Sequence, residues 1–116
     1  MKYVDGFVLV VPRKSLNAYV RMARAAGKVW REQGAIEFKE CAGDDLRPGM
    51  GIPFPRLAKS RRGETVMFSF IVYTSRAHRD RVNAAVMKDP RLANMTDMPF
   101  DVKRMAYGGF KVLVDA

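Results

Sequence analysis

The sequence has few of the residues on which cross-linking, metal binding and nucleophilic catalysis depend. Among its 116 residues there are one cysteine and one histidine. Because Cys41 has no second cysteine to pair with, no disulfide forms within the chain, and we expect a reducing, cytoplasmic compartment. We interpret Cys41 as a buried, inert thiol. One histidine, one cysteine and scattered carboxylates provide no recognisable ligand spacing, so we expect neither a metal site nor a cofactor.

Long hydrophobic runs are absent too, and acids are scarce relative to bases. No apolar stretch approaches the roughly 20 residues that span a membrane, so we expect no membrane partner. The 21 lysines and arginines outnumber the 12 acids, and the formal net charge is +9. Such a balance attracts polyanions nonspecifically. The bases are spread along the chain, however, and indicate an anionic partner only weakly. The densest group is Arg56, Lys59, Arg61 and Arg62.

The run at residues 66–73 is apolar on both faces of a strand, because side chains alternate across a strand. One face carries Val66, Phe68, Phe70 and Val72, and the other carries Met67, Ile71 and Tyr73. Helices of the same chain can cover one face. A chain of this size has little left to cover the second, so we predict a homodimer in which the sheet of an identical subunit covers it.

The wider pattern predicts strand, helix, strand, long connection, strand, helix, strand in a single domain, residues 1–116. Strands are expected over 2–11, 35–42, 66–73 and 102–114. The fold class is therefore α+β: a ferredoxin-like βαββαβ arrangement, with a four-stranded antiparallel sheet and two helices on one face. Two such sheets facing each other close into a dimeric α+β barrel.

Local signals mark where the helices begin and end. Ser15 is a candidate N-cap of the first helix, and Gly34 suits a left-handed cap after it. Thr74 or Ser75 caps the second helix, which Pro90 ends or bends. Adjacent glycines at 108–109 predict a bulge or a close backbone approach in the last strand.

The connection at residues 43–62 is long for a compact domain and is rich in glycine and proline. Two interpretations stand side by side. Such loops are often lids or binding loops. The alternative is an arm that packs across the dimer or extends a hairpin.

Five local strings resemble a bacterial family of unknown function typified by the enterobacterial YbaA protein. They are residues 3–7 (YVDGF), 27–30 (GKVW), 75–83 (SRAHRDRVN), 87–91 (MKDPR) and 107–110 (YGGF). Together they span nearly the whole chain. The resemblance implies the dimeric α+β-barrel superfamily and a ferredoxin-like fold. It implies no activity, because none is established for the family.

The wider superfamily includes haem-degrading enzymes, which rely on a Trp, a His and an Asn at set places. The resemblance puts Tyr73 at the Trp position, Met95 near the His position and Phe7 near the Asn position. All three residue types differ. Haem degradation by that mechanism is therefore disfavoured.

Five residues are candidates for a ligand pocket between helices and sheet: Asp5, Phe7, Tyr73, His78 and Arg104. As the single histidine, His78 must serve any imidazole acid–base step. A histidine satisfied within the core is the competing interpretation. Tyr73 could place a hydroxyl in the pocket, with Asp5 and Arg104 as polar companions. Surface exposure or pairing with a basic neighbour explains both charges without a ligand.

RNA-recognition domains share this strand order, so RNA binding is a possibility that their sequence signature can test. Those domains place Lys/Arg-Gly just before an aromatic on the third strand. Here Arg62-Gly63 is followed by Glu64, Thr65 and Val66, so we do not expect specific nucleic-acid binding.

We therefore predict a cytoplasmic, homodimeric barrel that binds a small apolar or aromatic molecule between its helices and sheet. The alternative is a noncatalytic dimer that binds an anionic partner, a nucleic acid or an acidic protein, through basic helix faces and the 56–62 loop. The sequence assigns no catalytic residue, and it leaves open whether the protein is an enzyme.

Overall fold

The computed structural model describes residues 1–47 and 49–116, and these form an α+β fold with a four-stranded antiparallel sheet. The strand order across the sheet is β2-β3-β1-β4, and each neighbouring pair runs antiparallel. The sheet is open, with β2 and β4 as its edges. Its strands are β1 (Tyr3–Pro12), β2 (Glu37–Ala42), β3 (Glu64–Tyr73) and β4 (Ala106–Lys111).

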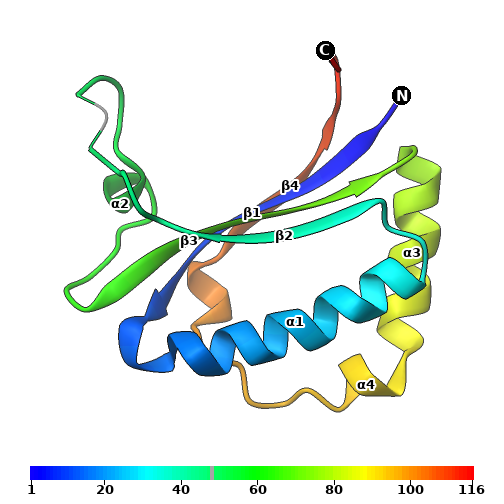
Figure 1. The fold of residues 1–116 in the computed structure, drawn as a ribbon, viewed down its shortest axis with the longest axis horizontal. Helices are drawn as coiled ribbons and strands as arrows, with labels where there is room; N and C mark the ends of the chain where they lie inside the picture. The colour runs from blue at the N-terminus through cyan, green and yellow to red at the C-terminus, as the bar shows by residue number, and fades with distance from the viewer. Residues whose placement is uncertain (48) are drawn as a thin grey trace.

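The longer helices lie on one side of this sheet, as Figure 1 shows. The helices of this layer are α1 (Leu16–Glu32), α3 (Arg76–Lys88) and the single turn α4 (Pro90–Ala93). Val29 of α1 and Val82 and Val86 of α3 form one buried cluster with Ile71 and Tyr73 of β3. Short 3-10 turns, η1 (Arg13–Ser15) and η2 (Val102–Arg104), precede α1 and β4. Within the described residues, no helix combines the length and apolar composition needed to cross a bilayer.

The pairing register divides every strand between a face toward the helices and a second face, which we call the bare face. Val4 pairs with both Val72 and Phe110, so the three side chains share the bare face. Phe68 and Phe110 there are 45% and 62% exposed. The helices of this chain cover one side of β3, while on the other side Phe68 is exposed and Val66 and Val72 are buried.

The 43–62 connection lies on the bare-face side of the sheet. It contains one short helix, α2 (Phe54–Leu57), which Figure 1 places across the sheet from α1. The Phe54 ring meets the Phe68 ring edge-on, with 6.1 Å between centroids. Met50 and Ile52 beside it are largely exposed. The connection therefore covers one end of the bare face and leaves its centre open.

Several predicted local signals are confirmed. The Ser75 hydroxyl accepts a hydrogen bond from the His78 amide at 3.0 Å, so Ser75 caps α3. Gly34 follows α1 with φ of 119°, the left-handed region that favours glycine. Gly109 allows a close approach rather than a bulge. A Cβ at that position would lie 2.7 Å from the Tyr3 ring.

Ser15 is the N-cap residue of α1, as predicted, although its side chain makes no capping hydrogen bond. Two predictions were wrong. Cys41 is exposed, not buried, because its side chain points to the bare face at the edge strand β2. The last strand begins at Ala106 rather than at residue 102, because Asp101 caps the η2 turn in between.

Candidate functional site

A cavity of about 160 Å³ lies between α1, the helix-facing side of the sheet and the segment that follows α4. Helix α1 contributes Ala23 and Ala26, the strands contribute Phe7 and Phe38, and the segment after α4 contributes Phe100. Four methionines complete walls that are almost entirely apolar. An apolar cavity of about 150 Å³ stays dry and holds a benzene-sized molecule. The cavity is therefore large enough for a six-membered ring.

One corner of the cavity is polar, and we call it the polar corner; it consists of Tyr19, Glu40 and Ser69. The Tyr19 hydroxyl donates a 2.8 Å hydrogen bond to Glu40 Oε1. Glu40 on β2 is directly opposite Ser69 on β3, and both side chains point toward the helices. Among the described residues no cation forms an ion pair with Glu40. The polar corner thus places a carboxyl group in an apolar wall without a countercharge.

Burial sets the electrostatics of this corner. It raises the pKa of the Glu40 carboxyl above its ordinary value, and hydrogen bonds from Tyr19 and Ser69 oppose the shift only in part. Burial, together with the neighbouring Glu40 carboxylate, also raises the pKa of Tyr19. Tyr19 consequently stays protonated and keeps its hydrogen-bond donor at all ordinary pH values.

Glu40 also marks the boundary between the cavity and the outside. A groove of about 480 Å³, here called the outer groove, runs between α1 and β2. Ala23, Phe38 and Glu40 line both the cavity and the outer groove. Arg24 and Lys28 are on the groove's outer rim. The cavity and the outer groove therefore share part of their lining.

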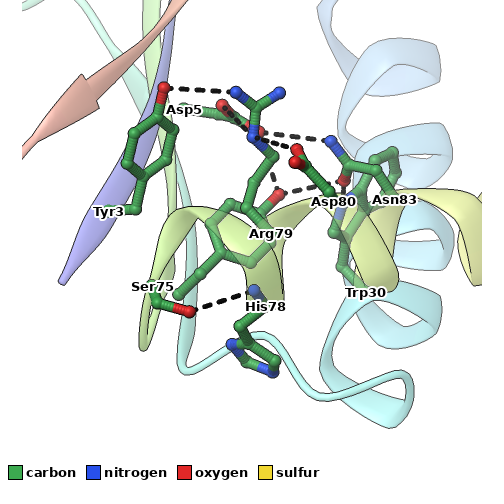
Figure 2. Close-up of polar contacts among 9 residues, drawn as sticks. Tyr3, Asp5, Trp30, Ser75, His78, Arg79, Asp80 and Asn83 are labelled. Carbon is green, nitrogen blue, oxygen red and sulfur yellow. Dashed lines mark hydrogen bonds and ion pairs between the residues drawn. The ribbon is translucent and has the colours of Figure 1, made fainter. Parts of the chain in front are cut away.

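A second polar cluster lies beyond the cavity wall, toward the start of α3. Figure 2 shows Trp30, Asn83 and Asp5 meeting from α1, α3 and β1. Trp30, which lines the cavity, donates its indole N–H to Asn83 Oδ1 at 3.0 Å. The Tyr73 hydroxyl lies 3.1 Å from both Asp5 Oδ2 and Asn83 Oδ1. This chain of hydrogen bonds fixes the orientation of the Trp30 ring in the cavity wall.

Asp5 is the buried acid at the centre of this cluster, with only 2% of its surface exposed. Arg79 Nε lies 3.7 Å from Asp5 Oδ1, and neither atom makes a hydrogen bond. Figure 2 also shows the Arg79 guanidinium reaching the Tyr3 hydroxyl, at 3.2 Å. Burial and the Asp5 carboxylate raise the pKa of Tyr73. The arrangement is a buried, charged network that ties β1, β3 and α3 together.

His78 makes local hydrogen bonds and is half-buried at the start of α3 rather than enclosed in the core. Its Nδ1 accepts a hydrogen bond from the Thr74 amide at 3.0 Å. Its ring packs edge-on against Tyr73, with 6.1 Å between centroids. A Cβ on Gly34 would lie 3.2 Å from His78 Nε2, so the second ring nitrogen faces the end of α1. His78 does not line the cavity.

The predicted pocket residues therefore separate into three groups. Asp5, Tyr73 and His78 lie together, but behind the cavity rather than in it. Phe7 lines the cavity and stacks on Tyr107, with ring centroids 5.4 Å apart. Arg104 is elsewhere, because η2 ends there and β4 begins only after it.

Arg104 instead binds the first residue of β3. Its guanidinium donates hydrogen bonds to both carboxylate oxygens of Glu64, at 2.6 and 2.9 Å, and to the Lys59 carbonyl at 3.0 Å. The Arg104 hydrogen bonds lower the pKa of Glu64 to about 2. Arg104 thus fastens the end of the 43–62 connection to β3 and has no contact with Asp5.

The proposed anion-binding residues lie around this same end of the molecule. Arg61 and Arg62 line a shallow depression, while Arg56 is on α2 and Lys59 follows it with φ of 53°. Asp44, Asp45 and Glu64 line the same depression. Arg13 and Arg47 line it as well, so arginines and acids are mixed there and the depression is not a uniformly positive surface. Within the described residues no group of three His, Cys, Asp or Glu side chains could hold a metal ion.

Sequence reasoning missed the polar corner. A signal was available, because Phe38, Glu40 and Ala42 alternate along β2 and must share a face. An acid on the same face as a core phenylalanine is unusual in a strand. Tyr19 lies in a buried cluster with Leu9, Ala23 and Met67, and its hydroxyl also reaches Glu40.

The sequence is similar to known proteins over nearly its whole length. It is 43% identical over 116 residues to the "Uncharacterized protein YbaA" of Escherichia coli K12 and to YbaA of Shigella flexneri, with 99% of each chain covered. A similar solved structure is the de novo designed protein Foldit4, with a TM-score of 0.49 and 8% identity over 97% of this chain and 99% of that one. Residues 2–102 match the model for a protein of unknown function, DUF1428. The chain belongs to this DUF1428 family, which the resemblance to YbaA had indicated.

Proposed function

We propose that this protein binds a small apolar or aromatic molecule in the cavity between α1 and the sheet. One observation carries the proposal: a cavity of about 160 Å³ with apolar walls and a single polar corner. Ligand pockets have this composition, since apolar walls supply affinity and a few placed polar groups supply orientation. His78 and Tyr73, the acid–base candidates, do not line the cavity, so the geometry supports binding rather than a reaction.

The proposed assembly is a homodimer in which two bare faces meet. A compact monomer of 13.1 kDa exposes roughly 6,400 Å², whereas this chain exposes 8144 Å². Its extents of 37 × 36 × 20 Å describe a two-layered slab. Exposed aromatic rings at Phe68 and Phe110 lie on the bare face. An exposed apolar face of this kind is typical of a protein–protein interface.

Two features support our proposal that the fold is a ferredoxin-like, dimeric α+β barrel. The order β2-β3-β1-β4 with both long helices on one side is the arrangement that two strand-helix-strand units produce. The open edges at β2 and β4 leave room for a second sheet to close a barrel. The unpaired, exposed Cys41 suits a reducing compartment, which supports a cytoplasmic protein.

Benzene titration tests the cavity, with thermal unfolding and Trp30 fluorescence as readouts. Trp30 is the only tryptophan and lines the cavity, so its emission reports on occupancy. Benzene should raise the melting temperature of the wild-type protein by preferential binding to the folded state. Ala26→Leu fills the cavity and should abolish the shift. Ala25→Leu adds the same atoms to the exposed side of α1 and should preserve it.

Two results would count against this function. The first is an unchanged melting temperature in saturating benzene, and the second is an equal response in Ala26→Leu and Ala25→Leu. Native mass spectrometry of untagged protein tests the assembly and also reveals any molecule that purifies with it. A dimer is expected, and Phe68→Asp should shift it toward monomer because the charge would lie in the proposed interface. A wild-type monomer at micromolar concentration contradicts the assembly.

The second candidate, binding of an anionic partner, draws on the bases along the outer groove. Arg24, Lys28 and Arg31 line that groove on the solvent side of α1. The 56–62 loop adds bases but shares its depression with acids. A mobility shift with nucleic acid that weakens steeply with salt would support this candidate. No shift at low salt would remove it.

A further inference from the structure

The polar corner indicates which ring-sized molecules the cavity selects. We propose that the ligand carries a hydroxyl or ammonium donor, and that Glu40 accepts its hydrogen bond at the polar corner of the cavity. This inference rests on the proposed function, because it concerns the specificity of the same cavity. It assigns to Glu40 the role of a specificity-determining residue.

Unused acceptor capacity on Glu40 is the first argument. A carboxylate offers about four lone-pair positions. Tyr19 occupies one of them, through Oε1 at 2.8 Å, and the Ser69 hydroxyl opposite takes up at most one more. No Lys, Arg or His pairs with Glu40 in the part of the chain that the structure describes. A partly buried carboxyl with few partners gains most from a further donor.

The second argument is the position of Glu40 among otherwise apolar walls. Glu40 lines the cavity and the outer groove together, so a donor group can reach it from inside. The remaining walls near it, Phe38 and Ala23, offer only apolar contact. A ring can therefore fill the apolar space while its one polar substituent points to the polar corner.

The third argument concerns the hydroxyls of the polar corner, which have different roles. The Tyr19 hydroxyl already donates to Glu40 and so holds the carboxyl in place. Ser69 is 5% exposed and lies opposite Glu40 across the β2–β3 pair. Burial raises the pKa of Glu40, as expected for a carboxyl with too few donors around it. A hydrogen-bond donor on the ligand would occupy lone pairs of the Glu40 carboxyl that the protein leaves without a partner.

Benzene and phenol form the decisive pair of probes, because they differ by one hydroxyl. In a purely apolar cavity phenol binds more weakly than benzene, since its hydroxyl loses hydrogen bonds to water. With Glu40 as acceptor, we expect the wild-type protein to bind phenol about tenfold more tightly than benzene, or about 1.4 kcal/mol. Benzylamine in place of phenol distinguishes an ammonium donor from a hydroxyl.

Glu40→Met is the informative variant, because methionine has a similar length and no comparable acceptor. In Glu40→Met the preference should reverse, with benzene bound more tightly than phenol. Glu37→Gln is the matched control on the same strand, since Glu37 is exposed and its side chain points to the bare face. It should keep the wild-type preference for phenol.

The outcomes separate the two proposals. Benzene binding without a preference for phenol or benzylamine overturns the role of Glu40 and leaves the cavity function standing. A preference that persists in Glu40→Met overturns that role too. Failure of the wild-type protein to bind any of the three probes overturns both the inference and the proposed function.

Discussion

The two acids beside Arg79 provide a direct comparison of distance and burial. Arg79 Nε lies 3.3 Å from Asp80 Oδ1 and 3.7 Å from Asp5 Oδ1. By distance alone, Asp80 is the stronger partner. The Asp80 side chain is 59% exposed, however, and that of Asp5 only 2%. We predict that replacing Asp5 is far more destabilising than replacing Asp80.

The magnitudes follow from what each replacement leaves behind. Asp5→Ala removes the acceptor of the Tyr73 hydroxyl and the Asn83 amide and leaves Arg79 without its buried countercharge. Breaking a buried pair on one side costs about 3–5 kcal/mol. An exposed ion pair contributes about 0–1 kcal/mol. Asp80→Ala should therefore change the free energy of unfolding by no more than about 1 kcal/mol.

Urea unfolding followed by circular dichroism and Trp30 fluorescence measures both effects, at one protein concentration for all variants. If Asp5→Ala does not fold, Asp5→Asn replaces it. That variant keeps an acceptor for Tyr73 and loses only the charge, so an intermediate loss is expected. The reasoning is refuted if Asp80→Ala costs as much as either Asp5 variant, or if Asp5→Ala costs less than about 1 kcal/mol.

Two further predictions concern the cavity and the outer groove beside it. Gly27→Ala should destabilise the protein by about 1–2 kcal/mol despite alanine's helix preference, because the new Cβ would lie 2.7 Å from the Phe38 ring. Urea unfolding measures this loss. A smaller loss of stability in a Phe38→Leu background would confirm that the contact with the ring is the cause. Glu40→Gln should be more stable than wild type at neutral pH. Burial raises the pKa of Glu40. The stability that Glu40 contributes to the fold is therefore fully present below the ordinary carboxyl pKa of about 4.3, and it is lost as the pH rises through the raised pKa. The stability difference should therefore grow with pH, and a constant difference would contradict this.

The periodicity of the sequence was enough to predict the framework. Alternation over residues 66–73 located β3 and indicated that its second face is only partly covered by this chain, as the exposed Phe68 shows. Gly34 and Ser75 marked the ends of helices because each meets a local backbone requirement that few residues satisfy. Requirements of this kind depend only on neighbours in sequence, so they can be predicted before the tertiary structure is known.

The candidate site depended on tertiary register and was predicted less well. Arg104 was placed beside Asp5 because the last strand was expected from residue 102. Strand β4 begins four residues later, which leaves Arg104 at the opposite end of the sheet, against Glu64. Cys41 was expected inside, but its neighbour Glu40 points to the helices, and alternation then puts Cys41 on the bare face. Which face of β2 points inward follows from pairing with β3 and not from β2 alone.

Asp5 and Glu40 show how a structural acid differs from a functional one in this fold. Asp5 is buried beside the Arg79 guanidinium, and Tyr73 and Asn83 donate to its Oδ2, so a countercharge and two donors offset much of its burial although Oδ1 makes no hydrogen bond. Glu40 accepts a hydrogen bond from Tyr19 and forms no ion pair among the described residues, and burial raises the pKa of its carboxyl despite the nearby hydroxyls of Tyr19 and Ser69. Positions that break a local rule without compensation are where function is expected. The same deficit that makes Glu40→Gln more stable at neutral pH is the one that a donor-bearing ligand would fill.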